Sequence, residues 1–251
     1  MLLDDKTAVI YGGGGAIGGA VARAFAREGA AVFLAGRSRS GLERVASDIR
    51  AAGGRAEIAE VDALDEHAVD SHLESVVADT GRVDISFNLI SHGDVQGTPM
   101  VQMRWQDYVE PVTTAVKTTF LTWRAAGRQM SRQGSGVILA FGGSADPPRG
   151  PYLGSLQIGF HAVEAMRRQL AVELGRSGVR VITLRTGGIP EAISESFSRR
   201  DEIAQSIADS TLLGRAATLQ DVGDVAAFAA SDAARTITGS TIDISCGTFL
   251  N

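Results

Sequence analysis

Short, almost continuously apolar stretches alternate with longer stretches of helical periodicity along the whole chain. Seven of the apolar stretches predict strands. They are Thr7–Tyr11, Ala31–Ala35, Ala56–Val61, Val83–Ile90, Gly136–Phe141, Val179–Leu184 and Thr241–Ser245. Strands that are apolar at nearly every position are typical of a parallel sheet covered on both faces. The pattern therefore predicts one α/β domain spanning residues 1–251, with a doubly wound, seven-stranded parallel sheet flanked by helices.

The stretches between these strands carry the periodicity of amphipathic helices. The clearest are Ala16–Glu28, Leu42–Ala52, Glu66–Thr80 and Ala115–Gln133. One segment, residues 189–213, breaks the alternation because it is polar and helical and follows the sixth strand. Ligands of open α/β sheets bind beyond the carboxyl ends of the strands, so this segment is predicted to be a lid or substrate loop. The alternative is that this segment is an ordinary surface loop.

A run of glycines joins the first strand to the first helix. Backbone amides at the start of a helix bind pyrophosphate, and glycines let the chain turn tightly enough to present them. The strand–glycine–helix context predicts a Rossmann-type dinucleotide site rather than a turn required by packing alone. The residues expected to form this part of the site are Gly12, Gly14, Gly15, Ala16, Ile17 and Gly18.

The end of the second strand bears on the choice of cofactor. A ribose 2′-hydroxyl is recognised by a carboxylate, whereas a 2′-phosphate is recognised by a guanidinium group. Here the chain reads Gly36-Arg37-Ser38-Arg39, without an acidic residue. NADP(H) is therefore expected in preference to NAD(H), with Arg37 and Ser38 as contacts. The alternatives are that these arginines are ordinary solvated residues at a helix start, and that no cofactor binds.

Several motifs together resemble the short-chain dehydrogenase/reductase family. The glycine run is similar to the family's TGxxxGIG motif, with Tyr11 for threonine and Ala16 for the middle glycine. The segment from Leu212 to Gly247, LLGRAATLQDVGDVAAFAASDAARTITGSTIDISCG, resembles the family's C-terminal run in register. The similarity extends over essentially the entire chain.

The resemblance implies further cofactor contacts beyond the glycine turn. Asp62 and Ala63 in VDALD stand where the family contacts adenine, and Asn88 in ISFNLIS matches the first asparagine of the NNAG motif. Ile189 follows the sixth strand, at the turn that reaches the cofactor in the family.

The same resemblance implies that the family's catalytic groups are missing. Carbonyl reduction in the family uses a tyrosine whose pKa is lowered by a lysine, together with a serine and an asparagine. The corresponding positions here hold Leu156, Phe160, Gly143 and Ala115. None of these side chains titrates, so the resemblance implies the fold of the family with a degenerate active site.

Other polar residues follow the strands and are candidates for chemistry. His92 and Asp94 come after the fourth strand and could form an oriented acid/base pair, since imidazole titrates near neutrality. Ser144 follows the fifth strand, and Tyr152 is expected to start the next helix one turn before Leu156. The alternative is that His92 is a solvent-exposed loop residue, and that Ser144 and Tyr152 are structural.

Composition excludes several classes of function. The net charge is −5 with no basic cluster, which argues against a nucleic-acid partner or an anionic membrane surface. The single cysteine, Cys246, excludes an internal disulfide, and no histidine cluster suggests a metal site. The chain has no apolar run of membrane-spanning length and no signal peptide pattern at its start, so a soluble, cytoplasmic protein is expected.

Three functions are consistent with these patterns. The first is an NADP(H)-dependent oxidoreductase acting on a small apolar ketone or activated alkene, because hydride addition to a polarised C=C demands less of a tyrosine. The second is a non-redox enzyme that uses His92 and Asp94 or Tyr152 as acid and base. The third is a ligand-binding or partner-stabilising pseudoenzyme. The resemblance also implies a dimer or tetramer formed through the helices around Lys117–Gln133 and Tyr152–Leu174.

Overall fold

Seven parallel strands form one continuous sheet in the computed structural model, which describes residues 1–143, 152–194 and 199–250. In chain order the strands are β1 (Thr7–Tyr11), β2 (Ala31–Gly36), β3 (Ala56–Glu60), β4 (Ile85–Asn88), β5 (Gly136–Gly142), β6 (Val179–Thr186) and β7 (Thr241–Ile244). They are arranged in the order β3-β2-β1-β4-β5-β6-β7. The predicted fold is confirmed, and each predicted strand boundary lies within two residues of the observed one.

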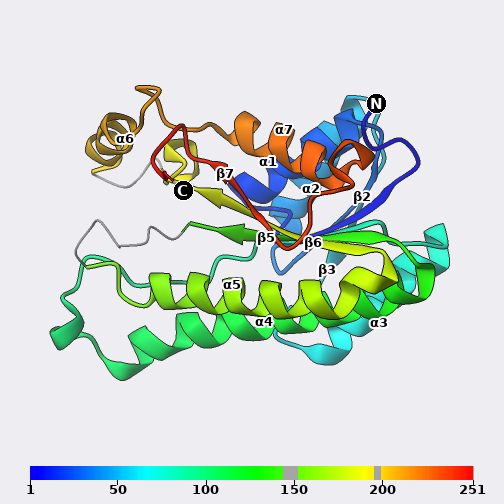
Figure 1. Cartoon of the computed structure of the whole chain (residues 1–251), viewed down its shortest axis with the longest axis horizontal. Helices are drawn as coiled ribbons and strands as arrows, with labels where there is room; N and C mark the ends of the chain where they lie inside the picture. The colour runs from blue at the N-terminus through cyan, green and yellow to red at the C-terminus, as the bar shows by residue number, and fades with distance from the viewer. Residues whose placement is uncertain (144–151, 195–198, 251) are drawn as a thin grey trace.

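Helices cover both faces of the sheet and produce three layers (Figure 1). One face carries α1 (Ala16–Arg27), α2 (Arg39–Ala51) and α7 (Leu219–Ala230), and the other carries α3 (Glu66–Thr80), α4 (Trp105–Gln133) and α5 (Leu156–Leu174). The remaining helix, α6 (Arg200–Asp209), lies at one end of the molecule beside the C-terminus. The order of β1 between β2 and β4 produces the change of winding direction at which α/β folds bind ligands.

Helix α4 is longer than the sequence predicts. The expected start was Ala115, but the helix begins at Trp105 and runs through Pro111. A proline lacks the amide that would bond the preceding turn, so the sequence alone favours a helix boundary there. Pro111 is buried, and packing of this part of the helix outweighs the missing hydrogen bond.

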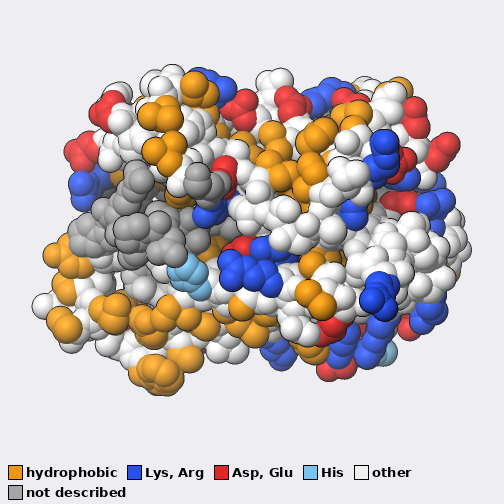
Figure 2. Space-filling model, viewed as in Figure 1, with side chains coloured by type: hydrophobic (Ala, Val, Ile, Leu, Met, Phe, Trp, Pro, Cys, Tyr) orange, Lys and Arg blue, Asp and Glu red, His pale blue; other side chains and the backbone are white. Residues whose placement is uncertain are grey.

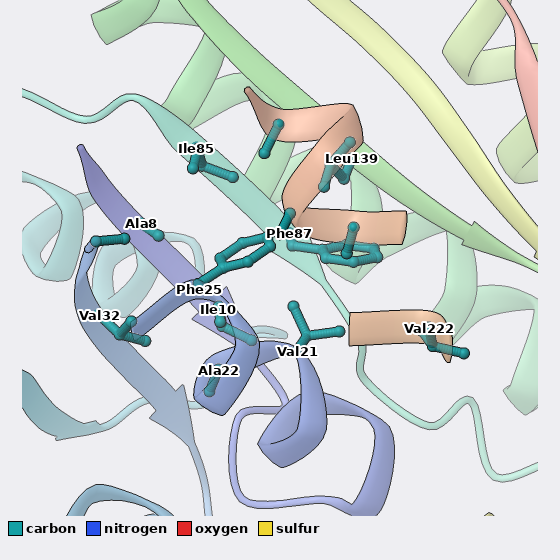
Figure 3. Packing of buried hydrophobic residues seen from close by; sticks show 14 of the residues in the cluster. Ala8, Ile10, Val21, Ala22, Phe25, Val32, Ile85, Phe87, Leu139 and Val222 are labelled. Carbon is teal, nitrogen blue, oxygen red and sulfur yellow. The ribbon is translucent and has the colours of Figure 1, made fainter. Parts of the chain in front are cut away.

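Two hydrophobic cores lie on opposite faces of the sheet. Strand β1 contributes to both, because successive side chains of a strand point to opposite faces. Ile10 packs in the core under α1, α2 and α7, where Phe25, Phe87 and Val222 lie together (Figure 3). Tyr11 packs in the other core, against α3 and α4. Burying one such aromatic side chain contributes roughly 1.5–3 kcal/mol, so the cores hold the strand ends in place from both sides.

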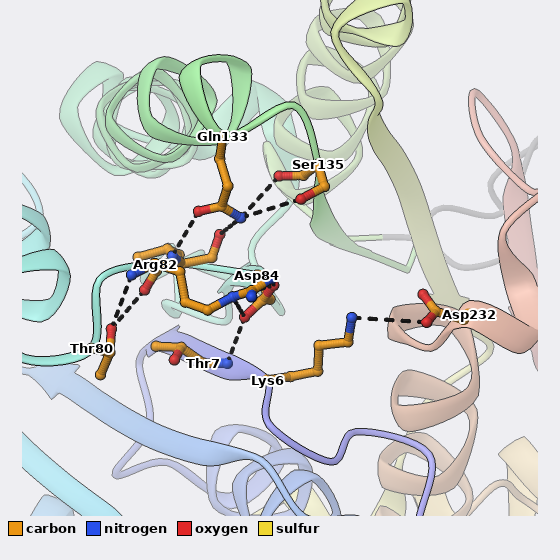
Figure 4. A network of polar contacts seen from close by, with 9 residues as sticks. Lys6, Thr7, Thr80, Arg82, Asp84, Gln133, Ser135 and Asp232 are labelled. Carbon is orange, nitrogen blue, oxygen red and sulfur yellow. Dashed lines mark hydrogen bonds and ion pairs between the residues drawn. The ribbon is translucent and has the colours of Figure 1, made fainter.

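A polar network closes the amino edge of the sheet. The Asp84 carboxylate accepts hydrogen bonds from the Thr7 amide at 2.9 Å and from Arg82 Nε at 2.9 Å. Gln133 at the end of α4 donates to the Val83 carbonyl at 3.1 Å (Figure 4). The network ties β1, β4 and α4 together at the amino ends of the strands, which leaves the carboxyl ends for the site.

Candidate functional site

The glycine turn is held by close backbone contacts at the carboxyl end of β1. Gly12 has a φ of 78°, and a Cβ there would lie 2.5 Å from the Leu89 carbonyl oxygen. A Cβ on Gly18 would collide with the Gly12 carbonyl oxygen. Both positions therefore require glycine because β4 and the first turn of α1 approach the loop so closely.

The start of α1 is open to an anion. The helix begins at Ala16, its N-cap Gly15 supplies no side-chain hydrogen bond, and its first turn has no acidic residue. A Cβ on Gly15 would meet no neighbour nearer than the Gly12 oxygen at 3.4 Å. The first amides of a helix have no partner within it, so this end can hold a phosphate group without displacing a protein group.

A cavity of about 630 Å³, here called the nucleotide cavity, extends from the glycine turn to the chain that follows β2 and β3. Arg37, Ser38, Arg44, Asp62 and Ala63 are among its lining residues. The Arg44 guanidinium donates to the Gly14 carbonyl at 3.3 Å, which joins α2 to the glycine turn. Within the described part of the chain, neither Arg37 nor Arg44 forms an ion pair with a carboxylate. These two cations remain available to a negatively charged ligand.

Arg39 differs from its neighbours in this respect. Its guanidinium contacts Glu60 at 3.2 Å and Glu43 at 3.5 Å. The three arginines near the end of β2 are therefore distinguished by their partners, which the sequence pattern alone did not resolve.

Asn88 is committed to the protein framework. Its amide nitrogen donates to Thr118 at 3.3 Å and to Thr122 at 3.5 Å, and its oxygen accepts from the Ile90 amide at 3.0 Å. These bonds fix the carboxyl end of β4 against α4. The residue lines the neighbouring cavity while it positions the chain on which His92 lies.

A second cavity, of about 310 Å³ and here called the crevice cavity, begins at the glycine turn. Ile17, His92, Asp94, Leu156 and Phe160 are among its lining residues. An adjoining outer cavity of about 860 Å³ shares Ile17, Leu156 and Phe160 and extends toward α6. The crevice thus has the turn on one side and apolar side chains of α5 on the other.

The four positions that resemble the family's catalytic set lie at or near this crevice. The Phe160 ring covers Gly143, because a Cβ on that glycine would lie 3.1 Å from Phe160 Cε2. Ala115 is buried against α5, where a Cβ on Gly159 would lie 3.5 Å from the Ala115 methyl group and 3.6 Å from His92 Nδ1. Of the four, Leu156 and Phe160 line the crevice cavity, Gly143 lines the outer cavity, and Ala115 is buried behind them; none of these side chains titrates.

His92 reaches the crevice, as the strand order predicts. Burial lowers the pKa of its imidazole, and the negative charge of Asp94 opposes that effect. The ring lies 5.9 Å from the Phe160 ring, centroid to centroid. Among the described residues, however, Asp94 accepts a hydrogen bond from Gln96 at 2.5 Å and none from His92. The two residues share a cavity, and no hydrogen bond between them is present among the described residues.

Tyr152 is not on the catalytic-type helix. Helix α5 begins at Leu156, and Tyr152 precedes it in a left-handed conformation, with φ 64° and 52% of its surface exposed. Its carbonyl accepts a hydrogen bond from the Gly97 amide at 2.9 Å. The predicted helix start at this residue is therefore wrong. Ser144, the remaining candidate, lies outside the described residues.

The segment after β6 contributes to the outer cavity. Ile189 is buried and lines it, and a short 3₁₀ turn, Pro190–Ala192, follows. The Glu191 carboxylate accepts a hydrogen bond from the Leu219 amide at 2.6 Å, so it is engaged with the start of α7. Ile203 and Ile207 of α6 line the same cavity.

Two side chains at these cavities escaped the sequence analysis. Arg44 occupies a polar position of α2, and its contact with the glycine turn spans thirty residues of sequence. Trp123 lines the crevice cavity from α4, where helical spacing marks it only as a core residue. No local signal distinguishes either one. Among the described residues, no group of three or more histidine, cysteine or acidic side chains could hold a metal ion.

The sequence model of one protein family, described as enoyl-(acyl carrier protein) reductase, matches residues 14–248. A second comparison gives 30% identity over 252 residues with the A-factor type gamma-butyrolactone 1′-reductase (1S-forming) of Streptomyces virginiae, covering 98% of this chain and 96% of the relative. The chain belongs to the short-chain dehydrogenase/reductase family. As a family member it is also 28% identical over 251 residues to the 3-oxoacyl-[acyl-carrier-protein] reductase FabG of Staphylococcus aureus (strain N315), covering 98% of each chain.

Solved structures of the family superpose over nearly the whole molecule. The crystal structure of NAD⁺-bound xylitol dehydrogenase matches with a TM-score of 0.89 and 26% identity, covering 98% of this chain and 100% of the other. A short-chain type dehydrogenase/reductase from Mycobacterium ulcerans matches with a TM-score of 0.90 and 28% identity, covering 99% and 91%. In the described part of the chain, no helix combines the length and the apolar character needed to cross a membrane.

Proposed function

We propose that this family member is an NADP(H)-dependent reductase of small, apolar activated alkenes, with ketones as poorer substrates. Several relatives are named as reductases or dehydrogenases, and one is named as an NAD(P)(+)-dependent L-rhamnose 1-dehydrogenase. The observation that carries the proposal is the crevice cavity, which has an open helix start on one side and the wall of Leu156 and Phe160 on the other. Such a space suits a phosphate-bearing cofactor next to an apolar reactant.

The residues present fit a nicotinamide dinucleotide. The open first turn of α1 would hold its pyrophosphate, and the nucleotide cavity, with Asp62 and Ala63, would hold its adenosine. Arg37, Ser38 and Arg44 would contact a 2′-phosphate. Asn88 and Ile189, which line the crevice cavity and the outer cavity, would border the rest of the cofactor. When bound in its reduced form, this cofactor would supply a hydride.

The apolar wall favours an alkene over a ketone. Reduction of a ketone produces an alkoxide, a strong base that needs an acid beside it. Neither Leu156 nor Phe160 can give a proton, and burial lowers the pKa of His92, which disfavours its protonated form. Hydride addition to the β-carbon of an enone instead produces a delocalised enolate, which can take its proton at the α-carbon from water. The sum is one hydride and one proton added across the C=C bond.

Turnover of matched substrates tests this preference. The protein is incubated with NADPH and either 2-cyclohexen-1-one or cyclohexanone, and NADPH consumption is followed. We expect the enone to be reduced to cyclohexanone faster than cyclohexanone is itself reduced, and reaction in D₂O to place deuterium at the α-carbon. If NADPH is consumed with neither compound, or if the ketone is reduced faster than the enone, the proposal is contradicted.

Nucleotide binding tests the cofactor preference separately. We expect Arg37→Ala and Arg44→Ala each to weaken NADPH binding by about tenfold, because a charge-assisted hydrogen bond to phosphate contributes roughly 1.5 kcal/mol. NADH binding should hardly change. Arg39→Ala is the matched control, since Arg39 is already paired with Glu60 and Glu43. Equal loss of NADPH and NADH affinity in the two variants would contradict recognition of the 2′-phosphate. Titration calorimetry measures all of these affinities.

Three further features belong to the proposal. Residues 189–213 would act as the lid of the substrate side, supported by the contacts of Ile203 and Ile207 with the outer cavity. The chain would assemble as a dimer or tetramer through α4 and α5, whose region bears hydrophobic side chains at the surface (Figure 2). A cytoplasmic location remains a prediction from the sequence.

A further inference from the structure

The crevice cavity continues into the core beneath β5. Its inner end is lined by Thr119 and Trp123 of α4, Ala140 of β5 and Val163 of α5, all of which are buried. Its outer end is lined by the exposed Gly15 and Ala16 and by the half-buried His92. The cavity therefore leads from the predicted cofactor site to the packed interface between the sheet and two helices.

Trp123 places a hydrogen-bond donor in this buried region. The side chain is 2% exposed, and its Nε1–H reaches no acceptor in the described part of the chain. Thr119 carries the only side-chain oxygen among these four inner lining residues, and Trp123 Nε1–H forms no hydrogen bond with it. A buried donor without a partner is destabilising, so a ligand atom that accepts from it gains binding free energy.

The remaining lining restricts what such a ligand can be. Among the described lining residues there is no lysine or arginine, and the one carboxylate, Asp94, belongs to the loop at the outer end. An anion would therefore enter an apolar space without a cation. The volume of about 310 Å³ is at the lower end of the range for ligand pockets, roughly 300–1,000 Å³, and suits a small ring or short chain.

We infer that the inner end of the crevice cavity binds a small, neutral, apolar group that carries a carbonyl oxygen, and that Trp123 Nε1–H donates to this oxygen. The inference rests on the proposed function, because it places part of the substrate in the same cavity. Trp123 is then a specificity-determining residue. It selects carbonyl-bearing ligands over hydrocarbons of the same shape.

The indole proton reports on this contact directly. The chain has two tryptophans, Trp123 and the 67% exposed Trp105, so protein labelled with ¹⁵N-indole tryptophan gives two indole N–H signals. The variant Trp105→Phe, changed at an exposed position, assigns them. The probes are cyclohexanone and methylenecyclohexane, in which a CH₂ group replaces the oxygen. Both are titrated without nucleotide, so that no turnover contributes.

We expect cyclohexanone to move the Trp123 indole proton downfield in a saturable manner, while the Trp105 signal stays in place. Methylenecyclohexane should move the Trp123 signal less. The variant Trp123→Phe should weaken cyclohexanone binding about three- to tenfold and leave methylenecyclohexane binding nearly unchanged. An unsaturable response, an equal response to both probes, or equal shifts of both tryptophans would overturn the inference.

A second variant tests the inference even if Trp123→Phe does not fold. Ala140→Val adds two methyl groups to the cavity lining and should weaken binding of both probes, whereas unchanged binding of both would place them elsewhere and overturn the inference. Failure here is distinct from failure of the proposed function. Enone reduction without a Trp123 response removes the inference alone, and a Trp123 response without NADPH consumption removes the redox proposal alone.

Discussion

The ring of Phe160 lies where a side chain on Gly143 would have to go. The gap of 3.1 Å between an added Cβ and the ring is tighter than ordinary van der Waals contact, and Gly143 does not have a left-handed backbone that would itself exclude other residues. The two positions are therefore coupled through packing. A serine at position 143 requires the Phe160 ring to shift.

This coupling gives a prediction for stability. We expect Gly143→Ser to lower the free energy of unfolding by about 1–3 kcal/mol, the usual cost of overpacking. In a Phe160→Ala background the same substitution should cost about 1 kcal/mol less, because the ring no longer occupies the space. Urea unfolding of the four proteins of the double-mutant cycle measures both terms. Strictly additive effects would show that the ring and the glycine are independent.

Residues of the site differ in how far the sequence reveals them. The glycine turn and Arg37 follow directly on predicted strands, so local pattern and topology suffice to place them near the crevice. Arg44 and Trp123 act through contacts with segments distant in sequence, with the glycine turn for one and with β5 and α5 for the other. Their roles depend on the packed molecule, and a periodic pattern reports only which face of a helix is buried.

At the level of elements, α3 is held against β1 by an edge-on contact between the rings of His72 and Tyr11, with centroids 5.8 Å apart. Burial lowers the pKa of His72 to about 4, from an ordinary value of 6.5. The unfolded chain therefore binds a proton at this residue between pH 6.5 and 4, while the folded protein does not. The contribution of neutral His72 is complete above pH 6.5 and is lost as the pH falls toward 4.

We expect this linkage to reduce the free energy of unfolding by up to about 3 kcal/mol over that interval. The variant His72→Asn should show a correspondingly weaker pH dependence in urea unfolding from pH 7 to pH 4. His67→Asn is the matched control, because His67 lies on the same helix but is exposed. If both variants keep the full pH dependence of the unchanged protein, other groups account for it.

Helix α7 packs on α1 at a glycine. A Cβ on Gly223 would lie 2.8 Å from the Ala24 side chain and 3.1 Å from the Ala20 carbonyl oxygen. We expect Gly223→Ala to destabilise the protein by about 1–3 kcal/mol, although alanine is the better helix former. Gly175→Ala should instead stabilise it by about 0.5–1 kcal/mol, since Gly175 has helical dihedral angles and no atom within 4 Å of an added Cβ. Thermal or urea unfolding distinguishes the two signs. Stabilisation by both substitutions would contradict the close approach of the helices.

The strands were predicted within two residues whether buried, like β4, or partly exposed, like β3. Most of them are apolar along most of their length, so composition marks them, and the parallel order follows from the repeated strand–helix alternation. The start of α4 could not be found in this way, because the backbone effect of Pro111 opposes the helix locally while packing supports it. Tertiary packing decided that boundary.

At the scale of the whole molecule, α5 presents an apolar outer stripe. Ile158, Ala165 and Val172 are exposed at a spacing of seven residues, which places them on one side of the helix. The hydrophobic side chains in Figure 2 gather over the region of α4 and α5, and Phe120 of α4 is exposed as well. Apolar side chains exposed together in this way are typical of an interface, and a second copy of the chain offers a self-complementary partner.

Sedimentation equilibrium tests this assembly. We expect the 26.2 kDa chain to sediment as a dimer or tetramer, and Val172→Asp to shift the population toward the monomer, because it places a charge in an interface that would exclude water. Leu213→Asp is the control, since Leu213 is also exposed but lies outside α4 and α5. If the unchanged protein sediments as a 26.2 kDa monomer, the apolar stripe does not bind a second copy. Loss of assembly in both variants would place the interface elsewhere. Loss in Val172→Asp alone, with NADPH binding retained, would show that each subunit keeps a complete nucleotide site of its own.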